Sequence, residues 1–164
     1  MKHFLILLIT FCVFTFCEGY SQKKCDIDSF SIIEKRKIEL FWYSLKEAVN
    51  TRNKLDLLQL CNFPFNCSFC VSNKSASRPF IRVNKKSFIS KYYKIFFNKN
   101  ILEIINSKKI LNILIADIQE DGSCGYSFSF PIVKSNSKTE GLQGFFTIKN
   151  LSGKYKICSG WTVP

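Results

Sequence analysis

Histidine is almost missing from this sequence. The 164 residues contain one, His3, and it lies in an apolar leader that we expect to be removed, so the mature chain has none. Serine and cysteine nucleophiles of hydrolases depend on a histidine that takes their proton. The absence therefore excludes serine–histidine and cysteine–histidine catalytic sites.

Glycine is scarce as well, and no apolar run reaches the length of a membrane-spanning helix. The seven glycines are never grouped into a loop that would cradle a nucleotide phosphate, which excludes that class of site. The longest apolar stretch, residues 4–16, has thirteen residues. A helix that crosses a bilayer needs about 20.

That apolar stretch has the layout of a secretory signal peptide. Lys2 precedes it, and Cys17-Glu18-Gly19 follows with small residues at positions −3 and −1 of a cut after Gly19. We therefore expect residues 1–19 to be a signal peptide and the protein to be exported, either to the periplasm or out of the cell.

The rest of the chain is expected to be a short tether, residues 20–30, and one domain, residues 31–164, a length that suits a single core. A lipid anchor on Cys17 or Cys12 is the alternative to plain cleavage. The residue before a lipidated cysteine should be small, and here it is phenylalanine in both cases.

Basic residues outnumber acidic ones throughout, and the formal net charge is +12. Between residues 74 and 109 there are ten basic residues against one acid, Glu103. Such a segment would attract an acidic protein, an acidic glycan or an anionic lipid surface, whereas export argues against nucleic acid. The alternative is a solvated helix face. The candidate basic surface consists of Lys85, Lys86, Lys91, Lys94, Lys108 and Lys109.

Six cysteines remain after cleavage, and an even number in an exported chain indicates disulfides. Fifteen pairings are open, and the sequence does not choose among them. The Cys67-x-x-Cys70 spacing would also suit a redox pair or half of a zinc site, but a structural disulfide is favoured. No metal and no cofactor are predicted. The disulfide candidates are Cys25, Cys61, Cys67, Cys70, Cys124 and Cys158.

The expected order of elements is helices first and strands afterwards. A Ser31/Glu34 capping box opens a helix to about residue 50, and Phe63-Pro64-Phe65 ends the short helix that follows. This segregation predicts an α+β domain with N-terminal helices packed on a curved antiparallel sheet. Helices are expected over 31–50, 54–61, 85–98 and 100–108, a polar loop over 66–79, and strands over 80–83, 110–118, 126–132, 142–149 and 155–163.

This order resembles the nuclear transport factor 2-like superfamily, the cone-shaped α+β fold of SnoaL-like proteins. The helix around residues 41–49, the turn 63–65, the helix 87–96 and the hairpin 145–157 carry the resemblance. The resemblance implies an exported bacterial member of this superfamily and often a homodimer through the open sheet face. It also implies a cavity between helix and sheet, for which the candidate lining residues are Trp42, Tyr43, Tyr126 and Trp161. The alternative, which aromatic residues in helices and strands favour, is that these side chains are part of the core.

Enzymes of this superfamily hold acid–base residues inside the cone, and here only Asp117 lies within an expected strand. It would act as a general base with Tyr43 or Tyr126 as the proton donor, in an isomerase or dehydratase. Nothing else in the sequence supports a catalytic site in which burial shifts the pKa of this carboxyl group, and a solvated Asp117 is favoured. We therefore expect a non-catalytic binding or interaction module with a basic helical face and a pocket for a small apolar or amphipathic ligand.

Expression with an intact export pathway tests the leader directly. We expect the exported protein to begin at Tyr20, because the apolar stretch is too short to remain as a membrane anchor, and to carry no lipid, because a phenylalanine precedes each leader cysteine. An intact mass spectrum checks both points. A full-length mass, or a mass increased by acyl chains on Cys17, would contradict the expectation.

Overall fold

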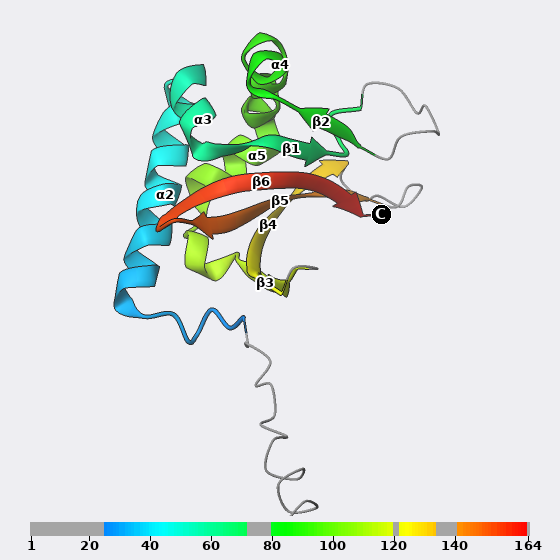
Figure 1. Ribbon diagram of the computed structural model, residues 1–164. Coiled ribbons are helices and arrows are strands. Elements are labelled where there is room, and N and C mark those ends of the chain that lie inside the picture. Colours follow the sequence, from blue (N-terminus) through cyan, green and yellow to red (C-terminus); the bar gives the residue numbers. More distant parts are fainter. Residues whose placement is uncertain (1–24, 72–79, 120–121, 134–140, 164) are drawn as a thin grey trace, which may run out of the picture.

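The computed structural model describes residues 25–71, 80–119, 122–133 and 141–163 (Figure 1). The expected signal peptide, with Cys12 and Cys17, lies outside the described residues, as do residues 20–24 of the expected tether. Within the described ranges, no helix combines the length and the apolar character that crossing a membrane requires.

The first helix, α2, spans Ile32–Asn50 and begins where the sequence predicts. The Ser31 side chain accepts a hydrogen bond from the Glu34 amide at 3.1 Å, which satisfies one free donor of the first turn. The Glu34 side chain does not return to the cap. It turns to the sheet instead, so only half of the expected capping box forms.

Helix α3, Lys54–Leu60, runs directly into strand β1, Cys61–Cys67. The turn that the resemblance implies at residues 63–65 is not formed, because these residues lie within β1, which pairs with β2 on one side and with β6 on the other. Pro64 has no amide hydrogen for the ladder. Accordingly, the register with the neighbouring strand shifts between Cys61 and Asn66.

The expected helix 85–98 is two elements. Helix α4, Lys85–Ser90, has an Asn84/Ser87 capping box, and the 3-10 helix η1, Tyr92–Phe97, follows it. Asn98 then caps α5, Lys99–Ser107, in place of the expected Asn100, whose side chain instead donates to the Pro131 carbonyl at 2.7 Å.

In the described ranges, six strands form one curved sheet in the order β2-β1-β6-β5-β4-β3. Four of the neighbouring pairs are antiparallel, and β1 and β6 run parallel, which corrects the expected all-antiparallel sheet. Strands joined by hairpins must alternate in direction, whereas β1 enters the sheet from a helix and is free of that rule. The further bounds are β2 Ile81–Val83, β3 Ile115–Ile118, β4 Cys124–Val133, β5 Leu142–Leu151 and β6 Lys154–Val163.

The expected strand 110–118 begins instead as a 3-10 turn, η2, Ile110–Asn112. Only the second half of the expected strand, Ile115–Ile118, pairs in the sheet. Ile110 is buried, so the apolar run that resembles a strand is satisfied by core packing.

Phenylalanine rings fill the concave side of the sheet. Phe146 on β5 stacks on Phe96 of η1 with centroids 4.9 Å apart, and Phe128 and Phe130 of β4 lie 5.6 and 5.2 Å from it. Phe69, in the loop after β1, adds a fifth ring at 5.3 Å. Helix α2 stands beside the sheet (Figure 1). The described chain is thus an α+β fold of N-terminal helices on a curved sheet.

Loss of a central ring should destabilise the protein strongly. We expect Phe146→Ala to lower the free energy of unfolding by about 3–5 kcal/mol, because the side chain is fully buried and leaves a cavity. Tyr43→Ala, at a side chain that is 65% exposed, should change it by less than about 0.5 kcal/mol. Urea unfolding of both variants measures the difference, and similar values for the two would contradict the packing described here.

Candidate functional site

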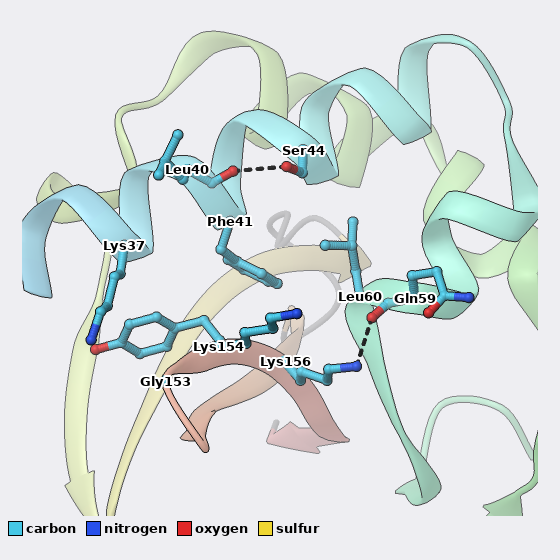
Figure 2. A pocket seen from close by; sticks show the side chains of 10 residues that line it. Lys37, Leu40, Phe41, Ser44, Gln59, Leu60, Gly153, Lys154 and Lys156 are labelled. Carbon is cyan, nitrogen blue, oxygen red and sulfur yellow. Dashed lines mark hydrogen bonds between the residues drawn. The ribbon is translucent and has the colours of Figure 1, made fainter.

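A groove lies between α2 and the start of β6 (Figure 2). Its volume is about 370 Å³, which is within the range of small-molecule sites. The wall from α2 consists of Lys37, Leu40, Phe41 and Ser44. The opposite wall consists of Gln59 and Leu60 at the end of α3 and of Gly153, Lys154, Tyr155 and Lys156 in the β5–β6 hairpin.

The local structure of α2 and of the β5–β6 turn positions the residues of the two groove walls. Lys37, Leu40 and Ser44 recur at spacings of three and four, so they share one face of α2. The Ser44 hydroxyl donates to the Leu40 carbonyl at 2.9 Å and is therefore occupied within the helix. Gly153 has φ +85°, a conformation that glycine adopts without strain, and it turns the chain so that Lys154 starts β6.

Three ammonium groups surround an apolar surface in this groove. Lys156 Nζ donates to the Gln59 carbonyl at 2.9 Å, which holds it across the junction of α3 and β6 (Figure 2). Lys37 lies 3.6 Å from a carboxylate oxygen of Glu34, and Lys154 is exposed. Leu40, at the α2 side of the groove, is 58% exposed, although a leucine would normally be buried. The arrangement suits a ligand with an anionic head and an apolar body.

The groove continues into a second hollow of about 320 Å³, which shares Ser44, Gln59 and Leu60 with the first. Two acids, Glu47 and Asp56, line this end. The charge is therefore positive at the β6 end and negative at the α3 end, so an anion would bind at the lysine end only.

A third hollow, of about 430 Å³, contains the side chain of Glu34 beside two tyrosines. The Tyr155 hydroxyl donates to Glu34 at 3.0 Å, and the Asn150 amide donates to it at 3.3 Å. Burial raises the pKa of Tyr155, and the hydrogen bond to Glu34 raises it further. Burial, together with the charge of Glu34, also raises the pKa of Tyr126. The Tyr155 hydroxyl and the Asn150 amide, both bound to Glu34, thereby tie α2 to the β5–β6 hairpin.

The four aromatic residues expected to line a cone cavity do not share one site. Trp42 is buried, donates its Nε1 hydrogen to the Lys108 carbonyl at 3.1 Å and meets Phe128 edge-on at 5.1 Å. Tyr126 is buried beside Phe30, with ring centroids 5.0 Å apart. Tyr43 is exposed, so it lines no cavity with the other three.

Trp161 likewise lies away from the concave face. It stacks on Phe145 with centroids 4.2 Å apart, donates to Thr147 Oγ1 at 3.0 Å and is 37% exposed. Along β5, Phe146 faces the core, and the alternation of a strand turns Phe145 to the opposite side. The Phe145–Trp161 pair therefore belongs to the convex face.

Asp117 is not a buried base. It is exposed on β3, which lies at the edge of the sheet, and it accepts a hydrogen bond from Gln119 Nε2 at 3.3 Å. Asp117 therefore does not face a cavity, because the register with β4 turns it away from the core, and its position is the solvated one that the sequence favoured. The isomerase or dehydratase alternative thereby loses its base.

The six lysines of the expected basic surface are all exposed, but they do not share one helix. Lys85 and Lys86 begin α4, Lys94 lies in η1, and Lys108 and Lys109 follow α5. A basic helix over 85–109 is therefore not formed, because the backbone breaks at Lys91 and again at Asn98. Lys91 lies between α4 and η1, with its Nζ 5.2 Å from the centre of the Tyr92 ring.

Four of the six cysteine candidates are paired, as Cys25–Cys124 and Cys67–Cys70. The Cys67-x-x-Cys70 spacing therefore closes a small loop as a disulfide. Cys61 and Cys158 are free thiols. Within the ranges described, no three histidine, cysteine or acidic residues gather as a metal site would require.

The groove residues were missed by the sequence analysis. Lys37, Leu60 and Lys154 lie far apart in the chain, and only the packing of α2 against β6 brings their elements together. The sequence offered one signal for the groove. Leu40 is apolar but does not belong to the buried face of α2, so it is left for another contact.

The raised pKa of Tyr155 predicts a loss of stability at alkaline pH. A group whose pKa is raised on folding stabilises the folded protein below its unfolded pKa, about 10 for tyrosine, and this contribution is lost as the pH rises toward the folded pKa. Urea unfolding at about pH 8 and about pH 11 measures how much the free energy of unfolding falls between the two pH values. This fall should be smaller in Tyr155→Phe than in the wild type. Equal losses would contradict this role.

Comparisons with known proteins give likeness of fold alone. No protein-family model matches the sequence, and a search of curated proteins finds no significant match. A solved structure from Xanthomonas campestris, named as a calcium/calmodulin-dependent protein kinase II association domain, is 14% identical over 77% of this chain and 84% of its own, with a TM-score of 0.39. An NTF-2 like protein of unknown function from Shewanella oneidensis is 13% identical over 77% of this chain and 96% of its own, with a TM-score of 0.41.

Proposed function

We propose that the mature chain is an exported, non-catalytic binding module that holds a small amphipathic anion in the groove between α2 and β6. The observation that carries this proposal is that Lys37, Lys154 and Lys156 line one groove together with apolar side chains, among them the exposed Leu40. An anionic head would pair with the ammonium groups, and an apolar body would cover Leu40 and Leu60.

The energetics favour such a ligand over a purely apolar one. The groove is open to solvent on one side, so apolar burial alone would be incomplete and the lysines would supply much of the affinity. A hydrogen bond to a charged group contributes about 1.5–3 kcal/mol. Lys156 is already held by the Gln59 carbonyl, which reduces the freedom that it would lose on binding.

The concave face of the sheet is a poorer location for a ligand than the groove. Phe128, Phe130 and Phe146 occupy the space in which a cone-shaped domain would hold a ligand. The one carboxylate between helix and sheet in the third hollow, Glu34, is occupied by Tyr155 and Asn150. These observations support binding at the groove and give no support to acid–base chemistry in the cone.

The exposed lysines between residues 85 and 109 favour a second candidate, contact with an acidic protein, an acidic glycan or an anionic lipid surface. Glu103 is the one acid among them. This contact would depend on charge spread over several elements and would weaken steeply with salt. A homodimer through the open sheet face stays a prediction for either candidate.

Binding of decanoate, with 1-decanol as the uncharged counterpart, tests the proposal by calorimetry or fluorescence titration. We expect decanoate to bind and decanol to bind at least about tenfold more weakly. The double variant Lys154→Gln/Lys156→Gln should weaken decanoate binding about tenfold or more, since it removes two cations from the groove. Lys94→Gln, an exposed lysine of η1, serves as the matched control and should bind like the wild type.

Two results would count against the groove. Equal binding of decanol and decanoate would show that the lysines play no part. A loss in Lys94→Gln as large as in the double variant would shift the function to the lysines between residues 85 and 109. Thermal unfolding of each variant establishes that the fold is intact.

A further inference from the structure

The two free cysteines lie on neighbouring strands. The Cα atom of Cys61, the first residue of β1, stands opposite Ile157 of β6, and Cys158 is the next residue. Adjacent strands lie about 4.8 Å apart and rise about 3.3 Å per residue, which places the two cysteine Cα atoms about 6 Å apart. A disulfide spans Cα separations of about 4.4–6.8 Å.

A bulge in β6 gives Cys158 the freedom to turn toward β1. Thr147 of β5 pairs with Ser159, whereas the next residue, Ile148, pairs with Ile157, so Cys158 is the extra residue of β6 at this point. A bulge releases a side chain from strict alternation and changes its direction. The register between β1 and β6 also shifts directly after Cys61.

The surroundings of the two thiols determine which one reacts first. Burial raises the pKa of Cys61, and the neighbouring Cys158 raises it further. Burial raises the pKa of Cys158 as well, while the charge of Lys149 opposes the rise. Cys158 is half-buried and Cys61 is buried, so an external reagent reaches Cys158 first.

We propose that Cys61 and Cys158 form a third disulfide, between β1 and β6, when the mature chain meets a small disulfide oxidant such as oxidised glutathione. The Cys158 thiolate attacks the oxidant, which releases one molecule of reduced thiol and leaves a mixed disulfide. The Cys61 thiolate then displaces the second thiol. Two protein thiols are oxidised, one external disulfide is reduced to two thiols, and the two protons leave with them.

This bond would fasten the one parallel junction of the sheet. The strands β2 and β1 reach the rest of the sheet through β6, and β1 is irregular at that junction. The proposal does not depend on the groove, although Gln59 and Lys156 lie two residues away from the two cysteines. The other four mature cysteines are already paired, so this bond would leave no free thiol in the exported chain.

Counting free thiols tests the proposal. The full mature chain is incubated with reduced and oxidised glutathione, denatured without a reductant, alkylated with N-ethylmaleimide and weighed by intact mass spectrometry. We expect no alkylation and, after proteolysis, one peptide pair that joins Cys61 to Cys158. The matched variant Cys158→Ser should take one alkyl group, at Cys61, and melt at a lower temperature than the oxidised wild type.

Three outcomes would overturn the third disulfide. Two alkyl groups on the wild type, at Cys61 and Cys158, would show that the thiols remain apart. A glutathione that stays on Cys158 would show that Cys61 does not reach it. A peptide that joins either cysteine to Cys67 or Cys70 would show a different pairing.

Discussion

The packing of rings around Phe146 is the interaction on which the rest of the structure depends. Its side chain contacts the rings of Phe69, Phe96, Phe128 and Phe130, which come from a loop, a 3-10 helix and a neighbouring strand. Aromatic pairs in such edge-on and stacked arrangements add to the free energy of burial. Because the rings come from distant parts of the chain, this cluster holds the loop after β1 and the helix η1 against strands β4 and β5.

This packing also determines where a ligand can bind. A curved sheet with helices on one side would usually leave a concave cavity, but here the concave side is filled, and Phe69 closes one end. A Cβ atom at Gly160 would lie 2.6 Å from the Phe69 ring, so the ring rests directly on the backbone of β6. The Cys67–Cys70 disulfide holds the loop that carries this ring. The binding site that we propose therefore lies outside the core, in the groove between α2 and the start of β6.

Most of the fold was predictable from local signals. Ser31 and the apolar residues at spacings of three and four predicted α2. The alternation from Tyr126 to Ile132 predicted β4. Both patterns reflect burial on one face of the element. Strand β1 was missed because Pro64 disfavours a central strand, yet packing of Phe65 overrides that preference. The site was not predictable, since the groove joins residues from three separate elements, and the convex position of Trp161 depends on strand register.

We propose that this domain binds at its outer groove because aromatic side chains fill its concave face. The most direct measurement is a two-dimensional NMR titration of the labelled mature chain with decanoate. Binding in the groove should shift the amide signals of Leu40, Leu60 and Lys154 with added ligand, while those of Phe128 and Phe146 stay in place. Shifts concentrated at Phe128 and Phe146 would show that the ligand enters the core, which would rule out the groove as the binding site.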